Sequence, residues 1–301
     1  MSDDDNSGGR QSARSLLERE LTLLCQSELL SEEGLRGKIN HHGLTSNNTF
    51  IRKFGFFCAA CGNERVTEGI IQCLLEYFPE AASATNENGW SPLHAACGNK
   101  NVTVNVIQLL IDVAPDSVRS VTNNGDTPLH VLCLSRKWDE AAAIEILKFL
   151  LQKHSEAVRH ADNRGSLPIH YASRRRSLDF CRLLIEAYPG CERIASAIGT
   201  LPLHHACLKG SLGTVKYLYQ QYPVAIHHGD VTRLYPIHRS IMGAMQRDNP
   251  DAAVEIVQFL LDCDPDVERQ KHEGMSLLQF ACEMNYEDSN KTGANKKSQG
   301  I

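Results

Sequence analysis

The chain has 301 residues, of which 42% are hydrophobic, and a formal net charge of −5 at pH 7. This hydrophobic fraction is enough to build a buried core, which excludes a wholly disordered chain, and no apolar run approaches the roughly 18 residues of a membrane span. The acidic balance argues against a protein that binds nucleic acid over its whole surface, although a local basic patch stays open.

The N-terminal segment, residues 1–13, is polar, and we expect it to be disordered. It lacks the apolar stretch of a secretory signal, so we expect an intracellular protein, cytoplasmic or nuclear, whose eleven cysteines are reduced thiols. From Leu16 to Leu30, leucines recur at helical spacing and predict an amphipathic helix that caps the following part of the chain. Residues 14–49 are therefore assigned to this capping helix and a linker.

A repeated sequence begins near residue 50. Its five clearest copies share a proline followed two residues later by a histidine: Pro92 and His94, Pro128 and His130, Pro168 and His170, Pro202 and His204, and Pro236 and His238. Successive histidines are 36, 40, 34 and 34 residues apart, and weaker copies at residues 56–61 and 277–282 bring the number to seven. Repetition at such a period is typical of solenoid proteins.

Each copy carries the signals of a turn followed by two helices. A glycine stands three residues before the proline position in five copies, as in Gly89 and Gly125, and follows Asn- or Asp-rich residues that favour tight turns. Ser91 or Thr127, followed by proline, predicts the N-cap and first turn of a short helix. Apolar residues at 3–4 spacing predict a second helix. One helix pair cannot bury its own apolar face, so the pairs must stack.

On these glycines, Pro-Leu-His sequences and paired helices, the chain resembles the ankyrin-repeat family. The resemblance implies an all-α solenoid of stacked helix–turn–helix units joined by β-turn or hairpin loops. We assign residues 50–285 to this array, with the first and last repeats degenerate, and residues 286–301 to a polar C-terminal tail. The sequence departs from the family pattern where Leu167, Leu201 and Tyr235 replace the capping Ser or Thr, and where Arg233 replaces the turn glycine. A tetratricopeptide array explains neither the turn glycine nor the Pro-Leu-His start.

The five histidines in register raise the question of a metal site. Neighbouring stacked helices lie about 8–10 Å apart, whereas zinc ligands lie about 2.0–2.3 Å from the metal, so equivalent histidines cannot share an ion. We favour a structural role, with each imidazole hydrogen-bonded to backbone in the adjoining turn, as the family resemblance also implies. No metal and no cofactor is expected.

The sequence gives little support to catalysis. Cys58 and Cys61 form a Cys-x-x-Cys at a helix start, which leaves a redox or metal role open as an alternative, although the βαβ context of a redox motif is absent. A P-loop, a nucleophile elbow and a His-Glu-x-x-His motif are all missing from the sequence. We therefore expect a protein that is not an enzyme.

The expected function is that of a scaffold or adaptor that binds another protein on the concave face of the solenoid. We expect no nucleic acid partner. The alternative is a regulatory, targeting or substrate-adaptor part of an enzyme complex, or a fragment of a longer ankyrin-containing enzyme.

Basic residues recur six positions after the histidine, at Lys100, Arg136 and Arg176. The neighbouring basic residues are Lys137, Arg174, Arg175 and Lys209. Because equivalent positions of stacked repeats lie about 10 Å apart, these residues predict a column of cations suited to an acidic or phosphorylated segment. The alternative is that they complement the negative C-terminal ends of the first helices. Trp90, Tyr171 and His205 are candidate aromatic anchors beside this column.

Overall fold

The computed structural model describes residues 5–42, 55–135, 138–246 and 250–284, with side chains described from residue 16 onward. These residues form an all-α solenoid of helix pairs, and they contain no strand beyond one isolated bridge between His272 and Met275. None of the described helices combines the length and hydropathy of a membrane span. The chain divides into two compact units, Met1–Asp162 and Asn163–Ile301, which we call unit 1 and unit 2 and describe separately.

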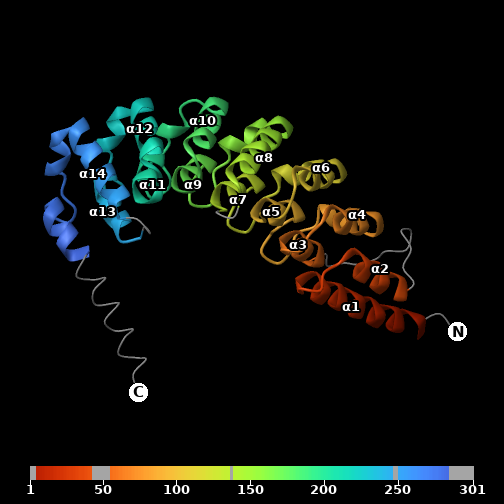
Figure 1. The fold of residues 1–301 in the computed structure, drawn as a ribbon. Helices are drawn as coiled ribbons and strands as arrows, with labels where there is room; N and C mark the ends of the chain where they lie inside the picture. The colour runs from red at the N-terminus through yellow and green to blue at the C-terminus, as the bar shows by residue number, and fades with distance from the viewer. Residues whose placement is uncertain (1–4, 43–54, 136–137, 247–249, 285–301) are drawn as a thin grey trace, which may run out of the picture. The chain divides into compact units, whose positions relative to one another are not determined.

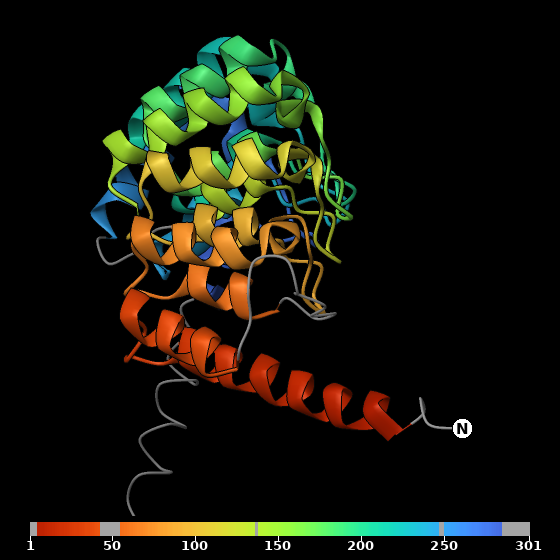
Figure 2. The ribbon, with the colours of Figure 1, turned by 90° about the vertical axis from the view of Figure 1, so that its right-hand side faces the viewer.

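Unit 1 contains an N-terminal helix pair followed by three repeat pairs among its described residues. The helices are α1 (Asp5–Gln26), α2 (Glu32–His41), α3 (Gly55–Gly62), α4 (Glu68–Tyr77), α5 (Pro92–Gly98), α6 (Val104–Val113), α7 (Pro128–Leu134) and α8 (Glu140–Lys153). The short 3-10 helices η1 (Pro79–Ala82), η2 (Pro115–Arg119) and η3 (Ser155–Arg159) follow the second helix of each repeat pair. The first helices α3, α5 and α7 pack in one row and α4, α6 and α8 in a second (Figures 1 and 2).

The N-terminal helix pair differs from the sequence expectation in two respects. Helix α1 starts at Asp5, inside the segment we expected to be disordered, and it ends at Gln26, before the Leu30 end of the predicted capping helix. The segment assigned to a linker contains α2, which Ser31 caps by accepting a hydrogen bond from the backbone N–H of Gly34. Because α1 packs on α3 and α2 packs on α4, the pair extends both helix rows of unit 1.

Two asparagines tie successive helix pairs of unit 1 together. The Nδ2 group of Asn99 donates hydrogen bonds to the carbonyls of Cys61 and Asn63, at 2.9 and 2.7 Å. Asn63, 36 residues earlier, donates in the same way to the carbonyls of Cys25 and Ser27, both at 2.9 Å. The amide groups therefore satisfy carbonyls at the end of each preceding first helix. This shared pattern explains why the N-terminal pair fits the stack.

Trp138 makes the corresponding link in the next repeat. Its indole Nε1 donates a 2.7 Å hydrogen bond to the carbonyl of Cys97, and its side chain is 7% exposed. Ser135, which occupies the asparagine position of this repeat, donates to the carbonyl of Gly98 at 3.2 Å. A buried tryptophan in the long connection thus replaces the missing amide.

Unit 2 contains three further helix pairs among its described residues. The helices are α9 (Pro168–Arg175), α10 (Leu178–Ala187), α11 (Pro202–Lys209), α12 (Leu212–Gln221), α13 (Pro236–Ala244) and α14 (Asp251–Cys263), with the 3-10 helices η4 (Cys191–Arg193), η5 (Pro223–His227) and η6 (Pro265–Arg269). The first helices α9, α11 and α13 pack side by side, as do the second helices α10, α12 and α14 (Figure 1). Residues 277–284 form one more helical segment. The predicted C-terminal tail lies outside the described residues.

The turns between helix pairs hold backbone in the left-handed region, where glycine is favoured. Gly89 has φ of 77°, and a Cβ there would lie 2.7 Å from the backbone nitrogen of Asn123 in the next turn. Arg233 occupies the same turn position in unit 2 and still adopts φ of 58°. The turn at Arg233 keeps its shape because Asp230 accepts hydrogen bonds from the backbone N–H groups of Thr232 and Leu234, both at 2.9 Å.

The repeated histidines cap the first helices and link neighbouring turns. In unit 2, His204 accepts a hydrogen bond at Nδ1 from the backbone N–H of Leu201 (3.1 Å) and donates from Nε2 to the carbonyl of Leu234 (3.2 Å). His170 makes the same pair of bonds with Leu167 and Thr200. Because the imidazole satisfies the N-cap backbone, a leucine can stand where the family pattern has a hydroxyl.

Candidate functional site

Two positions of the first helices recur among the residues that line one recess in each unit. They are the first and fourth residues after the histidine position, which share one side of the helix because they are three residues apart. We call them the inward positions. In unit 1 they are Ala59, Gly62, Ala95 and Gly98, counting Cys58 as the histidine position of the first repeat. In unit 2 the inward positions that line a recess are Arg174, His205, Leu208 and Arg239.

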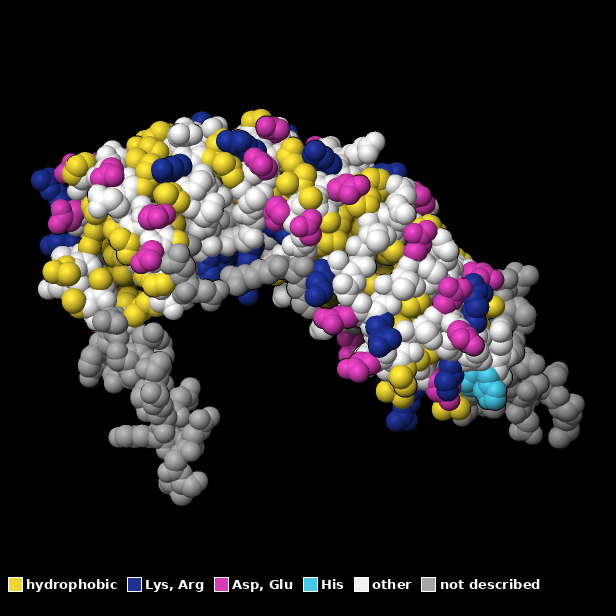
Figure 3. Space-filling view, in the orientation of Figure 1, with side chains coloured by type: hydrophobic (Ala, Val, Ile, Leu, Met, Phe, Trp, Pro, Cys, Tyr) yellow, Lys and Arg dark blue, Asp and Glu magenta, His cyan; other side chains and the backbone are white. Residues whose placement is uncertain are grey.

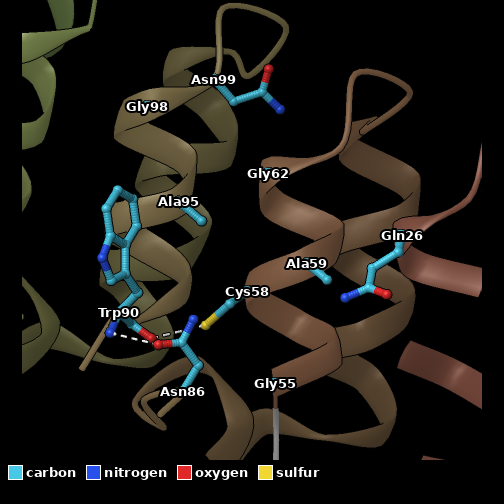
Figure 4. Close-up of a pocket in the computed structure, with 10 residues that line it drawn as sticks. All are labelled: Gln26, Gly55, Cys58, Ala59, Gly62, Asn86, Trp90, Ala95, Gly98 and Asn99. Carbon is cyan, nitrogen blue, oxygen red and sulfur yellow. Dashed lines mark hydrogen bonds between the residues drawn. The ribbon is translucent and has the colours of Figure 1, made fainter. Parts of the chain in front are cut away.

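The recess of unit 1 is an open groove of about 400 Å³ beside α3 and α5 (Figure 4). We call it the unit 1 groove. Its lining residues are Gln26, Gly55, Cys58, Ala59, Gly62, Asn86, Trp90, Ala95, Gly98 and Asn99. Because these positions are glycine or alanine, no long side chain covers the helix surfaces there, and the backbone of another chain can approach them closely.

Trp90 is held at one edge of the unit 1 groove by the turn that precedes α5. The side-chain oxygen of Asn86 accepts hydrogen bonds from the backbone N–H groups of Trp90 and Asn88, both at 3.0 Å. The thiol of Cys58 donates to the carbonyl of Trp90 at 3.0 Å, as Figure 4 places these groups together. The indole ring is half-buried and lies 6.0 Å from the ring of His94. A half-buried tryptophan on a fixed backbone is a suitable anchor for a partner.

The thiols of the Cys-x-x-Cys sequence are both buried. Burial raises the pKa of Cys58 to about 12 and that of Cys61 well above its ordinary value. Reactive cysteines need a thiolate at neutral pH, so this environment disfavours redox chemistry at either residue. Among the described residues, no group of three or more His, Cys, Asp or Glu side chains is arranged to hold a metal ion.

One recess of unit 2 is a small pocket of about 130 Å³, which we call the arginine pocket. Its lining residues are Arg174, Ile198, Thr200, His204, His205, Leu208 and Arg239. Figure 3 shows Lys and Arg side chains gathered in the hollow beneath α9 and α11. Three successive first helices contribute to the pocket, Arg174 from α9, His205 from α11 and Arg239 from α13.

Arg239 is fixed by an ion pair at the back of the arginine pocket. Its Nη2 lies 2.6 Å from Oδ2 of Asp230, whose side chain is 2% exposed. Burial disfavours the charged form of Asp230, but hydrogen bonds from Thr232, Leu234 and Arg239 outweigh burial and hold its pKa below the usual range. The Nε of Arg239 is buried and has no hydrogen-bond partner among the described residues.

His205 lies between the two arginines of the pocket. Its Nε2 is 3.3 Å from the hydroxyl of Thr200, and its ring meets the ring of His170 edge-on with centroids 5.6 Å apart. Burial lowers the pKa of His205 to about 3, and the nearby positive charges of Arg174 and Arg239 act in the same direction. The imidazole is therefore neutral at physiological pH.

A family model described as ankyrin repeats, in three copies, matches residues 56–156 and 139–230. The chain belongs to the ankyrin-repeat family. Ankyrin repeats generally mediate protein–protein interactions and are typically non-catalytic. A comparison with curated proteins finds no significant match to this chain.

The cations that we expected to form one column along the ankyrin repeats differ in their exposure. Lys100 is exposed in the turn after α5, while Arg136 and Lys137 lie outside the described residues. Arg176 is only 5% exposed, with its guanidinium carbon 5.3 Å from the centroid of the Phe180 ring. The sixth position after the histidine falls beyond the end of the short first helix, where the chain turns, and its side chain is exposed at Lys100 and buried at Arg176.

Other expected residues lie on the first helices of unit 2. Arg174 and Arg175 occupy the last turn of α9, Lys209 ends α11, and all three are half-buried. Tyr171 is a half-buried residue of α9. The structure brings Arg174 and His205 into one pocket, and it places Trp90 on the unit 1 groove.

Arg239, Asp230 and Thr200 were not predicted from the sequence as site residues. A signal for Arg239 was present, because it follows His238 just as His205 follows His204 and Tyr171 follows His170. The position directly after the histidine lines a recess at Ala95, His205 and Arg239. Asp230 carried no such signal, since its role depends on the turn that brings it to Arg239.

Proposed function

We propose that this ankyrin-repeat protein is a non-catalytic adaptor that binds a segment of another protein along the inward positions of its first helices. The observation that carries the proposal is that the same two helix positions line a recess in each unit. The surface available to a partner is therefore built into the repeat itself.

Variation between repeats supports a recognition role for the inward positions. The histidine position is His in five repeats, because the capping geometry requires it. The residue directly after it is Ala95, Val131, Tyr171, His205 or Arg239 in the same five repeats. A position that packs in the same way in each repeat keeps one residue type, whereas a position that contacts an asymmetric partner differs from repeat to repeat.

The unit 1 groove has the properties of a protein contact. Its volume of about 400 Å³ is within the range of about 300–1,000 Å³ common for ligand sites. Small residues form its floor and Trp90 stands at its edge, so a partner backbone can lie in the groove against an aromatic anchor. Lys100 lies outside the groove and is proposed to steer an acidic partner toward it.

The proposal is tested by placing a photo-crosslinking amino acid at Ala95 in the unit 1 groove. The matched control carries the same amino acid at Gln72, an exposed residue of the outer helix α4. Crosslinking in cells, followed by mass spectrometry, is expected to capture a partner protein from position 95 and not from position 72. A crosslinker at Ala59, which lines the same groove, should capture the same partner in the otherwise unchanged chain and lose it when Ala95→Arg is introduced.

Equal capture from both positions, or from Gln72 alone, would show that the inward positions are not the binding surface. An enzyme captured specifically from position 95 would support the role of a substrate adaptor or regulatory subunit within an enzyme complex. Purified chain that retains catalytic turnover through successive chromatographic steps would contradict the non-catalytic function.

A further inference from the structure

We infer that the arginine pocket of unit 2 binds one carboxylate side chain, an Asp or Glu of the partner protein, between Arg174 and Arg239 and against His205. The inference rests on the proposed function, because it requires a partner that lies along the inward positions. The inference adds to the proposed function the chemical identity of one partner group, a carboxylate, that binds in unit 2.

The arginine pocket contains a donor that the described residues do not use. The Nη2 group of Arg239 donates a hydrogen bond to Asp230, whereas its buried Nε has no hydrogen-bond partner among the described residues. A buried N–H of a charged group is rarely left without an acceptor. A guanidinium carries five N–H donors, so Arg239 can hold Asp230 and a second carboxylate together.

The position of the two arginines suits an anion between them. Arg174 comes from α9 and Arg239 from α13, and His205 lies on the intervening helix α11. Both arginines line the same pocket as His205, and their positive charges disfavour protonation of its imidazole. Hydrogen bonds between guanidinium and carboxylate groups are charge-assisted and stronger than neutral ones.

The size and walls of the arginine pocket favour a single side-chain group. A volume of about 130 Å³ accommodates the end of one side chain but not a peptide segment. Ile198 and Leu208 provide apolar walls, which lower the local dielectric constant and strengthen an ion pair formed there.

The charge of the pocket favours a carboxylate over a phosphate. Asp230 already neutralises part of the charge of Arg239, and His205 is neutral at physiological pH. A phosphate carries about −1.5 to −2 charges at pH 7 and would face the Asp230 carboxylate behind Arg239. A carboxylate carries a single negative charge and has two acceptor oxygens where a phosphate has three, so it matches the limited positive charge.

The test uses the full chain and three short peptides, Ac-Ala-Ala-Xaa-Ala-Ala-NH2, in which Xaa is Glu, Gln or phosphoserine. Binding is followed by NMR through the imidazole signals of His205, assigned with His205→Gln. The Glu peptide is expected to shift these signals saturably at millimolar concentration, and the Gln peptide, which has the same shape without the charge, is expected to leave them unchanged.

Variants place the contact within the pocket. Arg174→Gln is expected to weaken the response to the Glu peptide at least tenfold, whereas Lys216→Gln, on the exposed face of α12, is expected to leave it unchanged. Arg239→Gln alone would leave the buried Asp230 carboxylate without its ion-pair partner. The second variant therefore combines Arg239→Gln with Asp230→Asn. This pair should also abolish the response, with the thermal unfolding midpoint recorded for each variant.

Equal shifts with the Glu and Gln peptides, or no shift with either, would overturn the inference without any protein variant. Tenfold tighter binding of the phosphoserine peptide would overturn it in favour of a phosphate. The adaptor function fails separately, since it depends on crosslinking at Ala95 in unit 1. If a partner is captured at Ala95 but the His205 signals do not shift with the Glu peptide, the carboxylate site in the arginine pocket is rejected and the adaptor function is retained.

Discussion

The Nε2 of His94 lies 2.9 Å from the carbonyl oxygen of Asp126, a residue of the following turn. The Nδ1 of the same ring accepts a hydrogen bond from the backbone N–H of Ser91, at 3.1 Å. Because Nδ1 accepts, the ring proton is on Nε2, and a single neutral imidazole joins the start of α5 to the next repeat. Each of these bonds is buried or nearly so, which gives the histidine a large effect on stability.

Replacing His94 with Ala is expected to lower the free energy of unfolding by about 1–3 kcal/mol. The change leaves the Asp126 carbonyl and the Ser91 N–H without partners in a buried place. Urea denaturation followed by circular dichroism measures the loss. His41→Ala, at an exposed position of α2, is the control and should change the midpoint little. An unchanged midpoint for His94→Ala would show that the ring does not bridge the repeats.

Stability is expected to decrease as the pH falls from about 6.5 toward 4. Burial lowers the pKa of His94 from 6.5 to about 4 and that of His204 to about 3. Between those values the unfolded chain binds protons that the folded chain does not, so the folded state loses about 1.4 kcal/mol per pH unit for each such histidine. Above pH 6.5 both states are neutral at these rings, and their contribution is constant.

This pH dependence is measured by urea denaturation at pH 7.5, 6.0 and 5.0. The slope should be smaller in His94→Gln, whose side chain does not titrate in this range. A free energy of unfolding that stays flat from pH 7.5 to 5.0 would contradict the assignment of neutral, buried histidines.

Replacing Arg233 with Gly is expected to stabilise the chain by about 0.5–1 kcal/mol. Arg233 has φ of 58°, where a residue with a Cβ is strained by roughly 1–2 kcal/mol, and the greater freedom of glycine in the unfolded chain offsets part of the gain. Gly199, with φ of 78°, occupies the same position one repeat earlier. Gly199→Ala should therefore destabilise, because its Cβ would lie 3.2 Å from Asp230. In thermal unfolding, the midpoint is expected to rise for Arg233→Gly and to fall for Gly199→Ala.

Replacing Trp138 with Phe is expected to cost about 1–3 kcal/mol. The variant keeps an aromatic ring but removes the Nε1 donor and leaves the Cys97 carbonyl unsatisfied in a buried place. Trp90→Phe is the matched control at the other tryptophan of the chain, which is half-buried. Urea denaturation monitored by the remaining tryptophan measures both variants, and equal losses would argue against a special role for the Trp138 hydrogen bond.

The repeat architecture could be predicted because its signals recur in the sequence at fixed offsets. The turn glycines, the Pro-Leu-His starts and the paired apolar helices each appear several times, so one degenerate copy does not hide the pattern. Helix α2 has no such repetition. Its start depends on the N-cap Ser31, and its position depends on packing against α4. That packing cannot be recognised from a single sequence.

The candidate site was harder to predict because it depends on the length of the first helix. Helix α9 ends at Arg175, so Arg174 still faces the arginine pocket while Arg176, two residues later, is buried. A shift of two residues thus separates a pocket residue from a core residue. The ion pair between Arg239 and Asp230 also escaped prediction, because it needs the left-handed turn at Arg233.

The two kinds of polar link in unit 1 run in opposite directions along the chain. His94 reaches forward to the turn that follows it, whereas Asn99 reaches back to the repeat before it. A truncation between the repeats of α5 and α7 therefore damages the two cut faces differently, because the imidazole donor of His94 loses its acceptor on the N-terminal fragment and the indole donor of Trp138 loses its acceptor on the C-terminal one. Fragments of this array intended for isolated expression need a compensating substitution that is specific to the side of the cut.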